Sequence, residues 1–259
     1  MFCSFTGYDT AHVILNGFMR KYLHGEEMKR YILKEYGSWG VMLMAFAAGP
    51  VVSGRFSMKA LAALLALALF INAKQSFTVW MRNTATEKTM PLAVFFAHVV
   101  LASALMTWVA GDRIMQLMPY AGIPFAYLLF LKLLGEHALP TEVFGFILLS
   151  CSSLIGRFAV SGVIDPLLFL AVAVFFTAGV FKVRIQFRKE MRYRMLMIAY
   201  LAISTVIYLA LGLPLLLLVP LADNLIFALT LYRANLSMTG WLEVIKGLAF
   251  LGLLACSHI

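Results

Sequence analysis

Charged residues are scarce in this chain. Asp, Glu, Lys and Arg make up 13% of its 259 residues, whereas they make up roughly 25% of a typical soluble domain. Hydrophobic residues make up 63%, and the mean hydropathy is +0.91. A soluble globule could not bury this much apolar surface, so we expect the chain to lie in a bilayer. This excludes a soluble enzyme, a disordered chain and a secreted disulfide scaffold. An outer-membrane barrel is also excluded, because its strands alternate polar and apolar residues and these apolar runs are continuous.

Residues that commonly build active sites are also few. The cysteines Cys3, Cys151 and Cys256 are far apart and form no CxxC pair, so we interpret them as small apolar residues. His98 has no second histidine or carboxylate at the i+4 spacing of a metal site. The sequence contains no glycine-rich phosphate loop, no Ser/His/Asp set and no paired carboxylates. It therefore predicts neither a metal site nor a cofactor.

Nine apolar segments follow a polar N-terminal stretch. Residues 1–36 carry apolar residues at helical spacing, which predicts a cytosolic amphipathic segment, with a solvated tail as the alternative. Residues 37–259 form the predicted transmembrane helical domain. Because one segment is short and Gly212 and Pro214 must make a turn between two others, we expect an all-α polytopic integral membrane bundle of eight or nine helices. The segments are 39–54, 58–80, 90–110, 114–133, 141–160, 164–182, 195–212, 214–231 and 241–257.

The basic residues are distributed unevenly across these segments. With the N-terminus in the cytosol, 17 of the 21 Lys and Arg residues lie at cytosolic ends and 4 at outer ends. This is the asymmetry of the positive-inside rule. It predicts a multi-pass protein of the cytoplasmic (inner) membrane with a cytosolic N-terminus. The net charge of +9 is then explained by orientation, and no nucleic-acid partner is expected.

Two polar segments are interpreted as cytosolic loops. They are residues 72–82, between the second and third spans, and residues 181–194, between the sixth and seventh. They lie four spans apart, and because four is even, the two halves would be parallel copies. Such halves would bring the two loops face to face over one cleft.

A motif at the first span resembles a known family. Residues 34–44, Lys-Glu-Tyr-Gly-Ser-Trp-Gly-Val-Met-Leu-Met, resemble the KEHGxWxMLL-type opening motif of the YwiC-like membrane proteins, with Tyr36 where that family usually has His. Two later segments agree with the family. These are residues 175–184 with the basic turn 188–190, and residues 240–247 before the last span.

The overall plan is also similar to the UbiA prenyltransferase superfamily. That resemblance implies about nine helices around a central cavity, and transfer of an isoprenoid from its diphosphate to an aromatic acceptor. It also implies Mg²⁺ held by two Asp-rich motifs. In this chain only Asn72 of the first motif is present, and the second is replaced by a basic stretch from Arg184 to Lys189. We therefore expect no Mg²⁺-dependent prenyl transfer. Whether the chain is an enzyme stays open; if it is one, it would be a prenyltransferase-like transferase.

Polar residues at membrane depth are the best functional candidates in such a sequence. Asp223 and Asn224 lie near the middle of an apolar segment, where they either form a structural pair with another span, with Lys246 as a candidate, or line a cavity. The basic run from Lys182 to Arg194 either anchors the protein to anionic lipid or captures an anionic headgroup. The candidate ligand-binding residues are Asn72, Lys74, Gln75, Arg82, Arg184, Arg188, Asp223 and Asn224.

Three functions remain open from the sequence. The first is a UbiA-like cavity that binds an isoprenoid or an anionic membrane lipid, with Lys74 and Arg82 facing Arg184 and Arg188 at its mouth. The second is a carrier for a small solute with Asp223 as its coupling group. Pro124 interrupts the fourth span, and Pro214 and Pro220 interrupt the eighth; the two spans lie four apart, which favours a carrier. The third is a non-catalytic accessory or assembly factor of a membrane respiratory system.

Overall fold

We analysed a computed structural model, which describes residues 35–82, 89–232 and 235–257. The predicted N-terminal amphipathic segment lies almost wholly outside the described residues. The chain divides into two compact units. Among the described residues, unit 1 lies within Ala68–Ala102, and unit 2 contains Glu35–Leu67 and the residues from Ser103 onward.

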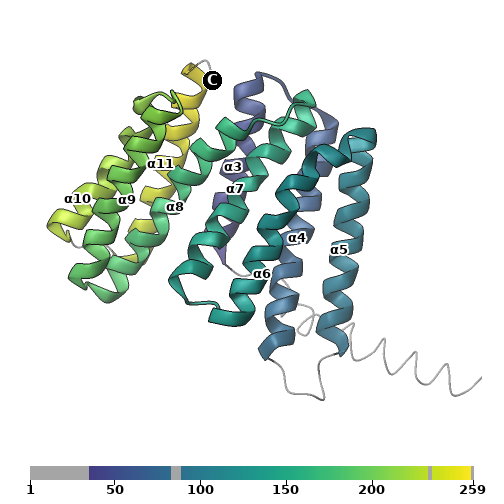
Figure 1. The fold of residues 1–259 in the computed structure, drawn as a ribbon, viewed down its shortest axis with the longest axis horizontal. Coiled ribbons are helices and arrows are strands. Elements are labelled where there is room, and N and C mark those ends of the chain that lie inside the picture. The colour runs from purple at the N-terminus through teal and green to yellow at the C-terminus, as the bar shows by residue number, and fades with distance from the viewer. Residues whose placement is uncertain (1–34, 83–88, 233–234, 258–259) are drawn as a thin grey trace, which may run out of the picture. The chain divides into compact units, whose positions relative to one another are not determined.

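The described residues are helical throughout, without strands, which confirms an all-α polytopic protein (Figure 1). Seven helical stretches among them are long and apolar enough to cross a membrane, with Thr89–Leu134 counted as one and Leu215–Thr230 falling short of the required length. The count of nine spans stays a prediction. In chain order the elements are α3 (Tyr36–Ser53), α4 (Met58–Arg82), α5 (Thr89–Ala110), the 3-10 helix η2 (Gly111–Ala121), α6 (Gly122–Leu134), α7 (Leu139–Ser161), α8 (Pro166–Arg188), α9 (Met191–Ala210), the 3-10 helix η3 (Leu215–Leu221), α10 (Ala222–Thr230) and α11 (Leu236–Cys256).

Both segments that the sequence predicted as cytosolic loops are largely helical, and that interpretation was wrong. Residues 72–82 are the last turns of α4, and residues 181–188 are the last turns of α8. Basic side chains do not end a helix at its C-terminus, because they interact favourably with the helix dipole there. The turn between α8 and α9 is confined to Lys189, in the left-handed conformation with φ 51°, and Glu190.

Unit 2 is built around a close crossing of α3 and α7. A Cβ atom on Gly49 would overlap the backbone of Gly156 and Arg157, and one on Gly156 would overlap the carbonyl oxygen of Phe46. The hydroxyl of Ser152 donates a hydrogen bond across the crossing to the carbonyl of Met42 (3.0 Å). Small residues let the two backbones approach, so dispersion and hydrogen bonds hold the pair where lipid supplies no hydrophobic drive.

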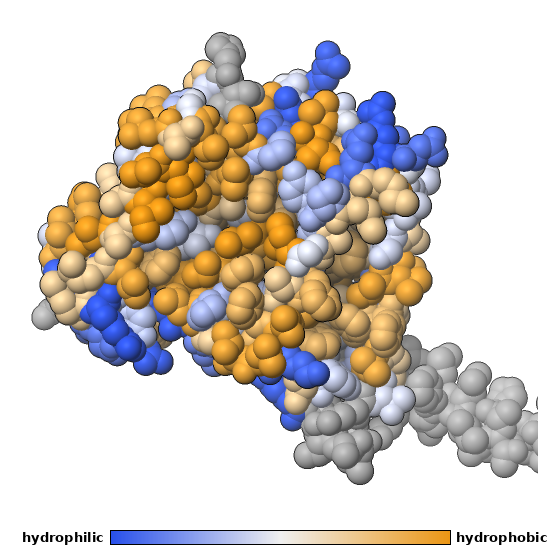
Figure 2. Space-filling model, in the orientation of Figure 1, coloured by the Kyte–Doolittle hydropathy of each residue, from blue (hydrophilic) through white to orange (hydrophobic). Residues whose placement is uncertain are grey.

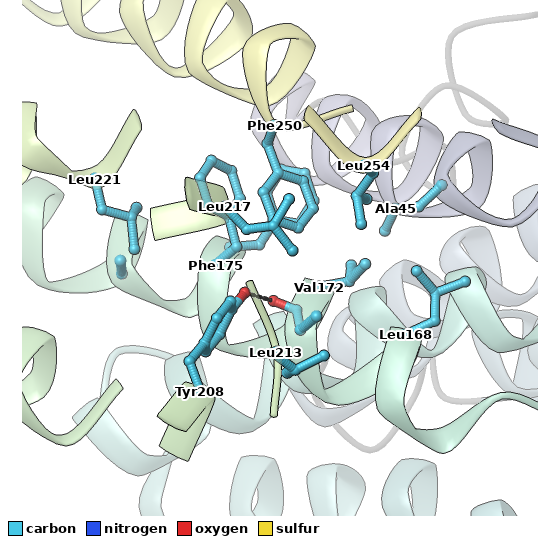
Figure 3. Close-up of a cluster of buried hydrophobic side chains, with 14 residues drawn as sticks. Ala45, Leu168, Val172, Phe175, Tyr208, Leu213, Leu217, Leu221, Phe250 and Leu254 are labelled. Atoms are coloured by element: carbon cyan, nitrogen blue, oxygen red, sulfur yellow. Dashed lines mark hydrogen bonds between the residues drawn. The ribbon is translucent and has the colours of Figure 1, made fainter. Parts of the chain in front are cut away.

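A second apolar core joins α8, α9, α11 and η3 (Figure 3). The rings of Phe175 and Phe250 stack with centroids 4.1 Å apart. The hydroxyl of the fully buried Tyr208 donates to the carbonyl oxygen of Ala171 (2.9 Å), so the buried polar atom has its partner. In this core α8 packs against α9, η3 and α11. It is the most buried of the candidate spans.

Contacts at helix ends show that helices of unit 2 run up and down. At one end Ser57 donates to the carbonyl of Ala159, and Arg157 donates to the hydroxyl of Ser53 (2.8 Å). At the other end Arg194 donates to the carbonyl of Ala228 (2.6 Å). Figure 2 shows orange hydrophobic side chains over much of the visible face, with blue hydrophilic ones at the lower left over the α8–α9 turn. This is the distribution of a lipid-facing surface with polar ends.

Unit 1 pairs the C-terminal part of α4 with the N-terminal part of α5. The rings of Phe77 and Phe95 lie 5.5 Å apart between the two helices. Ser76 donates to the carbonyl of Asn72, which satisfies its hydroxyl within α4. Nδ1 of His98 lies 2.8 Å from the carbonyl oxygen of Val94, one turn back in α5. His98 is therefore a hydrogen-bonded helix residue, as its sequence context suggested.

Candidate functional site: a buried network of two lysines and two carboxylates

Three helices of unit 2 bring four charged side chains together. Lys182 comes from α8, Asp223 from α10, and Glu243 and Lys246 from α11. The ammonium of Lys182 donates to Oδ2 of Asp223 and lies 3.3 Å from Oε1 of Glu243. The ammonium of Lys246 lies 2.5 Å from Oε1 of Glu243 and 3.3 Å from Oδ2 of Asp223. Each lysine thus contacts both carboxylates, and we call these four residues the charge network.

Neutral side chains complete the surroundings of the charge network. The hydroxyl of Tyr232 donates to Oδ1 of Asp223 (2.7 Å), and burial together with this bond raises the pKa of Tyr232. The amide oxygen of Asn224 accepts a hydrogen bond from Lys246. The ring of Phe227 lies 5.7 Å from Nζ of Lys182, within the range of a cation–π contact.

The lysines and the carboxylates differ in exposure. The side chains of Lys182 and Lys246 are 0% and 7% exposed, whereas those of Asp223 and Glu243 are 27% and 35% exposed. Two positive and two negative charges give a formal sum of zero. Such neutrality is required, because a charged side chain at membrane depth must find a partner. The lysines therefore form the inner part of the network and the carboxylates its accessible part.

A break in one helix positions Asp223. The 3-10 helix η3 contains Pro220 and gives way to α10 at Ala222, so Asp223 lies in the first turn of α10. The backbone stays in the right-handed helical region across this change, and the N–H of Ala222 donates to the carbonyl of Val219. Lys246 lies midway along α11, and Lys182 about two turns before the end of α8. In Figure 1 these three helices lie together on the left of the view.

The structure decides what several predicted residues contact. Asp223 and Asn224 both contact Lys246, so the pairing with another span that the sequence allowed is present. Lys182 was interpreted as part of an interfacial basic run, and this was wrong, because its side chain is fully buried. Lys246 was counted among the cytosolic basic residues. Its side chain is also buried, midway along α11.

Arg184 and Arg188 have different surroundings from one another. Arg184 donates to Oε2 of Glu142 (2.7 Å) and to the carbonyl of His137 (2.6 Å), so its charge is compensated within unit 2. Arg188 is exposed at the end of α8. Arg184 therefore has partners within unit 2 without any bound anion.

The other predicted residues, Asn72, Lys74, Gln75 and Arg82, lie on α4 within unit 1. They share one helix over three turns, as expected from their spacing. Their proposed meeting with Arg184 and Arg188 involves both units, and it stays a prediction.

Sequence reasoning missed Glu243 and the burial of Lys182. The signal for Glu243 was present: an acidic residue three positions before Lys246, which places both on one face of the helix. No comparable signal marked Lys182, because it lies where an apolar segment ends and a basic run begins. Within the described ranges, no group of three or more His, Cys, Asp and Glu residues could hold a metal ion.

Comparison with protein families gives one match. The family model described as YwiC-like protein matches residues 32–156, which include the opening motif at residues 34–44. Residues 175–190 and 240–247, which also suggested the family, lie beyond the matched region. Comparison with curated proteins and with solved structures finds no match. The matched region confirms the resemblance seen in the sequence: residues 32–156 are similar to the YwiC-like protein family, and the apolar helices make the chain a multi-pass helical membrane protein.

Proposed function

We propose that the protein is a membrane carrier for a small solute, with the charge network as its binding and coupling site. The observation that carries this proposal is the break between η3 and α10, a change from 3-10 to α geometry within the apolar helical stretch Leu215–Thr230, which comes directly before Asp223 and Asn224. Discontinuous helices at which ionisable residues gather are typical of solute and ion sites in secondary transporters.

A second broken helix supports the same proposal. The 3-10 helix η2 passes into α6 at Gly122, four helical segments before η3 passes into α10. Breaks at corresponding places in two four-span halves are the sequence-level sign of a carrier. Among the open alternatives, a lipid-binding cavity and an accessory factor do not require such breaks.

The energetic cost of the charge network also favours a functional role. Four charges on three helices are costly to remove from water, and buried ion pairs rarely add stability over well-packed apolar residues. Intramembrane charged networks are therefore functional sites by default. The partly exposed carboxylates give a solute access that a purely structural pair would not need.

Ligand-dependent stability of the purified full chain tests this proposal. A panel of inorganic ions, amines, amino acids, sugars and carboxylic acids is screened for a rise in the unfolding temperature. A ligand at 100 times its Kd stabilises by about 2.7 kcal/mol. We expect a solute that stabilises the native chain and Asp165→Asn but not Asp223→Asn. Asp165 caps α8 outside the charge network and Asn retains the cap, so it is the matched control.

Counterflow of that solute in liposomes then distinguishes carrying from binding. Carrier activity predicts uptake against preloaded solute by the native chain and by Asp165→Asn, and its loss in Asp223→Asn. A panel in which no solute depends on Asp223 would reject the proposal.

Binding of an anionic headgroup is a second candidate, favoured by the α8–α9 turn. Arg188 and Lys189 are exposed there, beside Arg192. Guanidinium and ammonium groups bind phosphate directly, so an anionic lipid or an isoprenoid diphosphate would suit this surface without Mg²⁺. A relation to the UbiA superfamily belongs to this proposal.

Native mass spectrometry with lipid analysis tests the headgroup proposal. Replacing Arg188 and Lys189 with Ala should reduce co-purifying anionic lipid, whereas Lys59→Ala, at the opposite helix end, should not. Unchanged lipid content in the double variant would reject it.

We also propose that the protein lies in the cytoplasmic membrane with the α8–α9 turn inside, on the basis of the charge asymmetry. An impermeant thiol reagent should label Arg188→Cys only in inverted vesicles and Lys59→Cys only in right-side-out vesicles. The reverse pattern would overturn this orientation.

A further inference from the structure

We infer that the solute is a small monovalent cation, exchanged one for one against a proton that leaves Lys246. This inference rests on the proposed carrier function and names the substrate class of its site.

A solute that reaches the charge network meets carboxylates. Asp223 and Glu243 are partly exposed, and the two lysines lie behind them. Oε1 of Glu243 contacts both lysines, whereas Oε2 accepts no hydrogen bond from a described residue. Oε2 lies toward Gly179 of α8, where an added Cβ would be 3.8 Å away. An added Cβ there would also be in ordinary van der Waals contact with the ring of Phe146 (3.7 Å), so the glycine leaves room only for a small group beside an acceptor oxygen, which suits a cation and repels an anion.

The number of carboxylates limits the charge of that cation. Calcium takes six to eight oxygen ligands, and this site offers two carboxylates already facing two ammonium groups. A divalent ion would leave the site strongly positive at membrane depth. A monovalent cation has the same charge as each ammonium group that the oxygens of Asp223 and Glu243 bind. It can therefore replace the positive charge of one lysine.

Charge balance then requires a proton to leave. The cation binds between Asp223 and Glu243. One N–H bond of the Lys246 ammonium breaks, the electron pair stays on Nζ, and the proton passes to water on the side from which the cation came. On the opposite side the cation leaves and Nζ takes up a proton from water. One cation moves one way and one proton the other, so the cycle is electroneutral.

Asn224 identifies Lys246 rather than Lys182 as the lysine that loses its proton. The amide oxygen of Asn224 accepts from Lys246, while its Nδ2 has no hydrogen-bond partner among the described residues although the side chain is fully buried. A neutral lysine has a lone pair that a rotated amide can donate to, so Asn224 serves both states of Lys246. Lys182 instead faces two carboxylates and the ring of Phe227, which all favour its charged form.

The other groups around Lys246 are accounted for. Among the residues that the structure describes, the charged and titratable side chains that face the charge network are its own four members and Tyr232, through Asp223. The helices α3 and η3, which pack against α11, contain no charged residue. No other charge from these elements can balance an incoming cation.

Proton movement in liposomes tests the inference. The full chain is reconstituted with a pH-sensitive dye inside, and Na⁺ or K⁺ is added outside, with choline as the control cation. Inward exchange predicts that the interior becomes alkaline with Na⁺ or K⁺ and not with choline, at a rate that an imposed membrane potential does not change. Binding of Na⁺ or K⁺ at Asp223 without any change in internal pH would overturn the exchange.

Two variants probe the steps separately. Asn224→Asp adds a carboxylate beside Lys246 and keeps it charged, so proton release should fall by about tenfold or more while Na⁺ still stabilises the protein. Gly179→Leu fills the space beside Glu243 and should weaken Na⁺ stabilisation. Gly252→Leu on α11, where an added Cβ meets nothing within 4 Å, should leave both signals unchanged. Full proton release in Asn224→Asp would reject the role given to Lys246.

The solute panel distinguishes failure of the cation proposal from failure of the carrier proposal. A neutral or anionic solute that depends on Asp223 would support the carrier and overturn the cation. A panel without any Asp223-dependent solute would overturn the carrier itself.

Discussion

Two helices of unit 2 are broken in the same way but differ in what lies at the break. In each, a 3-10 helix containing a proline (Pro119 in η2, Pro220 in η3) passes directly into an α-helix. The second residue of the α-helix is Ile123 after the first break and Asp223 after the second. Among the residues of η2 none is buried, whereas η3 buries Leu217 and Leu221.

The change of helix geometry is therefore a feature of the fold, whereas the charged residues at the second break are a separate, chemical feature. A change from 3-10 to α geometry needs only local backbone adjustment, and it occurs with or without charge. Ile123 packs beside a small apolar cluster that includes Cys151 and Leu154. Asp223 instead meets two lysines from other helices. Of the two breaks, the second is the one at which charged side chains from different helices meet.

The largest expected effect comes from removing a lysine at the second break. Lys182→Met leaves Asp223 and Glu243 facing Lys246 alone, with one uncompensated negative charge. Removing one partner of a buried pair costs about 3–5 kcal/mol. Unfolding in detergent should show this loss, while Lys132→Met, at the end of α6 after the first break, should change stability by less than about 0.5 kcal/mol.

A double variant checks the cause. Lys182→Met combined with Asp223→Leu removes both charges and should recover most of the lost stability, since the remaining Glu243 and Lys246 still balance. If the double variant is as unstable as the sum of the single variants, lost packing and not lost charge is responsible.

Placing a charge at the first break should give the next largest effect. Ile123→Asp copies Asp223 at a position that packs beside an apolar cluster, and Asp at the centre of a membrane helix costs about 2.5–3.5 kcal/mol on insertion scales. Ile123→Asn is the matched control and should cost less. An Ile123→Asp variant as stable as the native chain would show that water reaches the first break.

A smaller effect is expected at the rim of the charge network. Tyr232→Phe removes the hydrogen bond to Oδ1 of Asp223 and keeps the aromatic ring. Because Tyr232 is only half-buried, the loss should be about 1 kcal/mol. The native chain also loses this bond when Tyr232 ionises at alkaline pH, above the usual range since its pKa is raised. Stability should therefore fall with rising pH there in the native chain and less in Tyr232→Phe, as thermal unfolding across that range would show.

Protein class and helicity depend on local properties of the chain, and they were predictable from the sequence. Apolar runs long enough to cross a bilayer require helices, because lipid offers backbone groups no other partner. Pro220, which interrupts the eighth predicted span, lies in η3, whereas Pro124 lies in the first turn of α6 and the proline of η2 is Pro119. The motif at residues 34–44 indicated the family that the match over residues 32–156 then confirmed.

Which charges meet was decided only by the tertiary structure. Lys182 and Arg184 are two residues apart, yet one is buried among carboxylates and the other pairs with Glu142 on α7. Their fates differ because successive positions on a helix face different neighbours, and those neighbours come from helices far away in the sequence. Composition and spacing therefore determined that the chain is a helical membrane protein with charges at depth. The packing of α8, α10 and α11 determined that two lysines and two carboxylates form one neutral site.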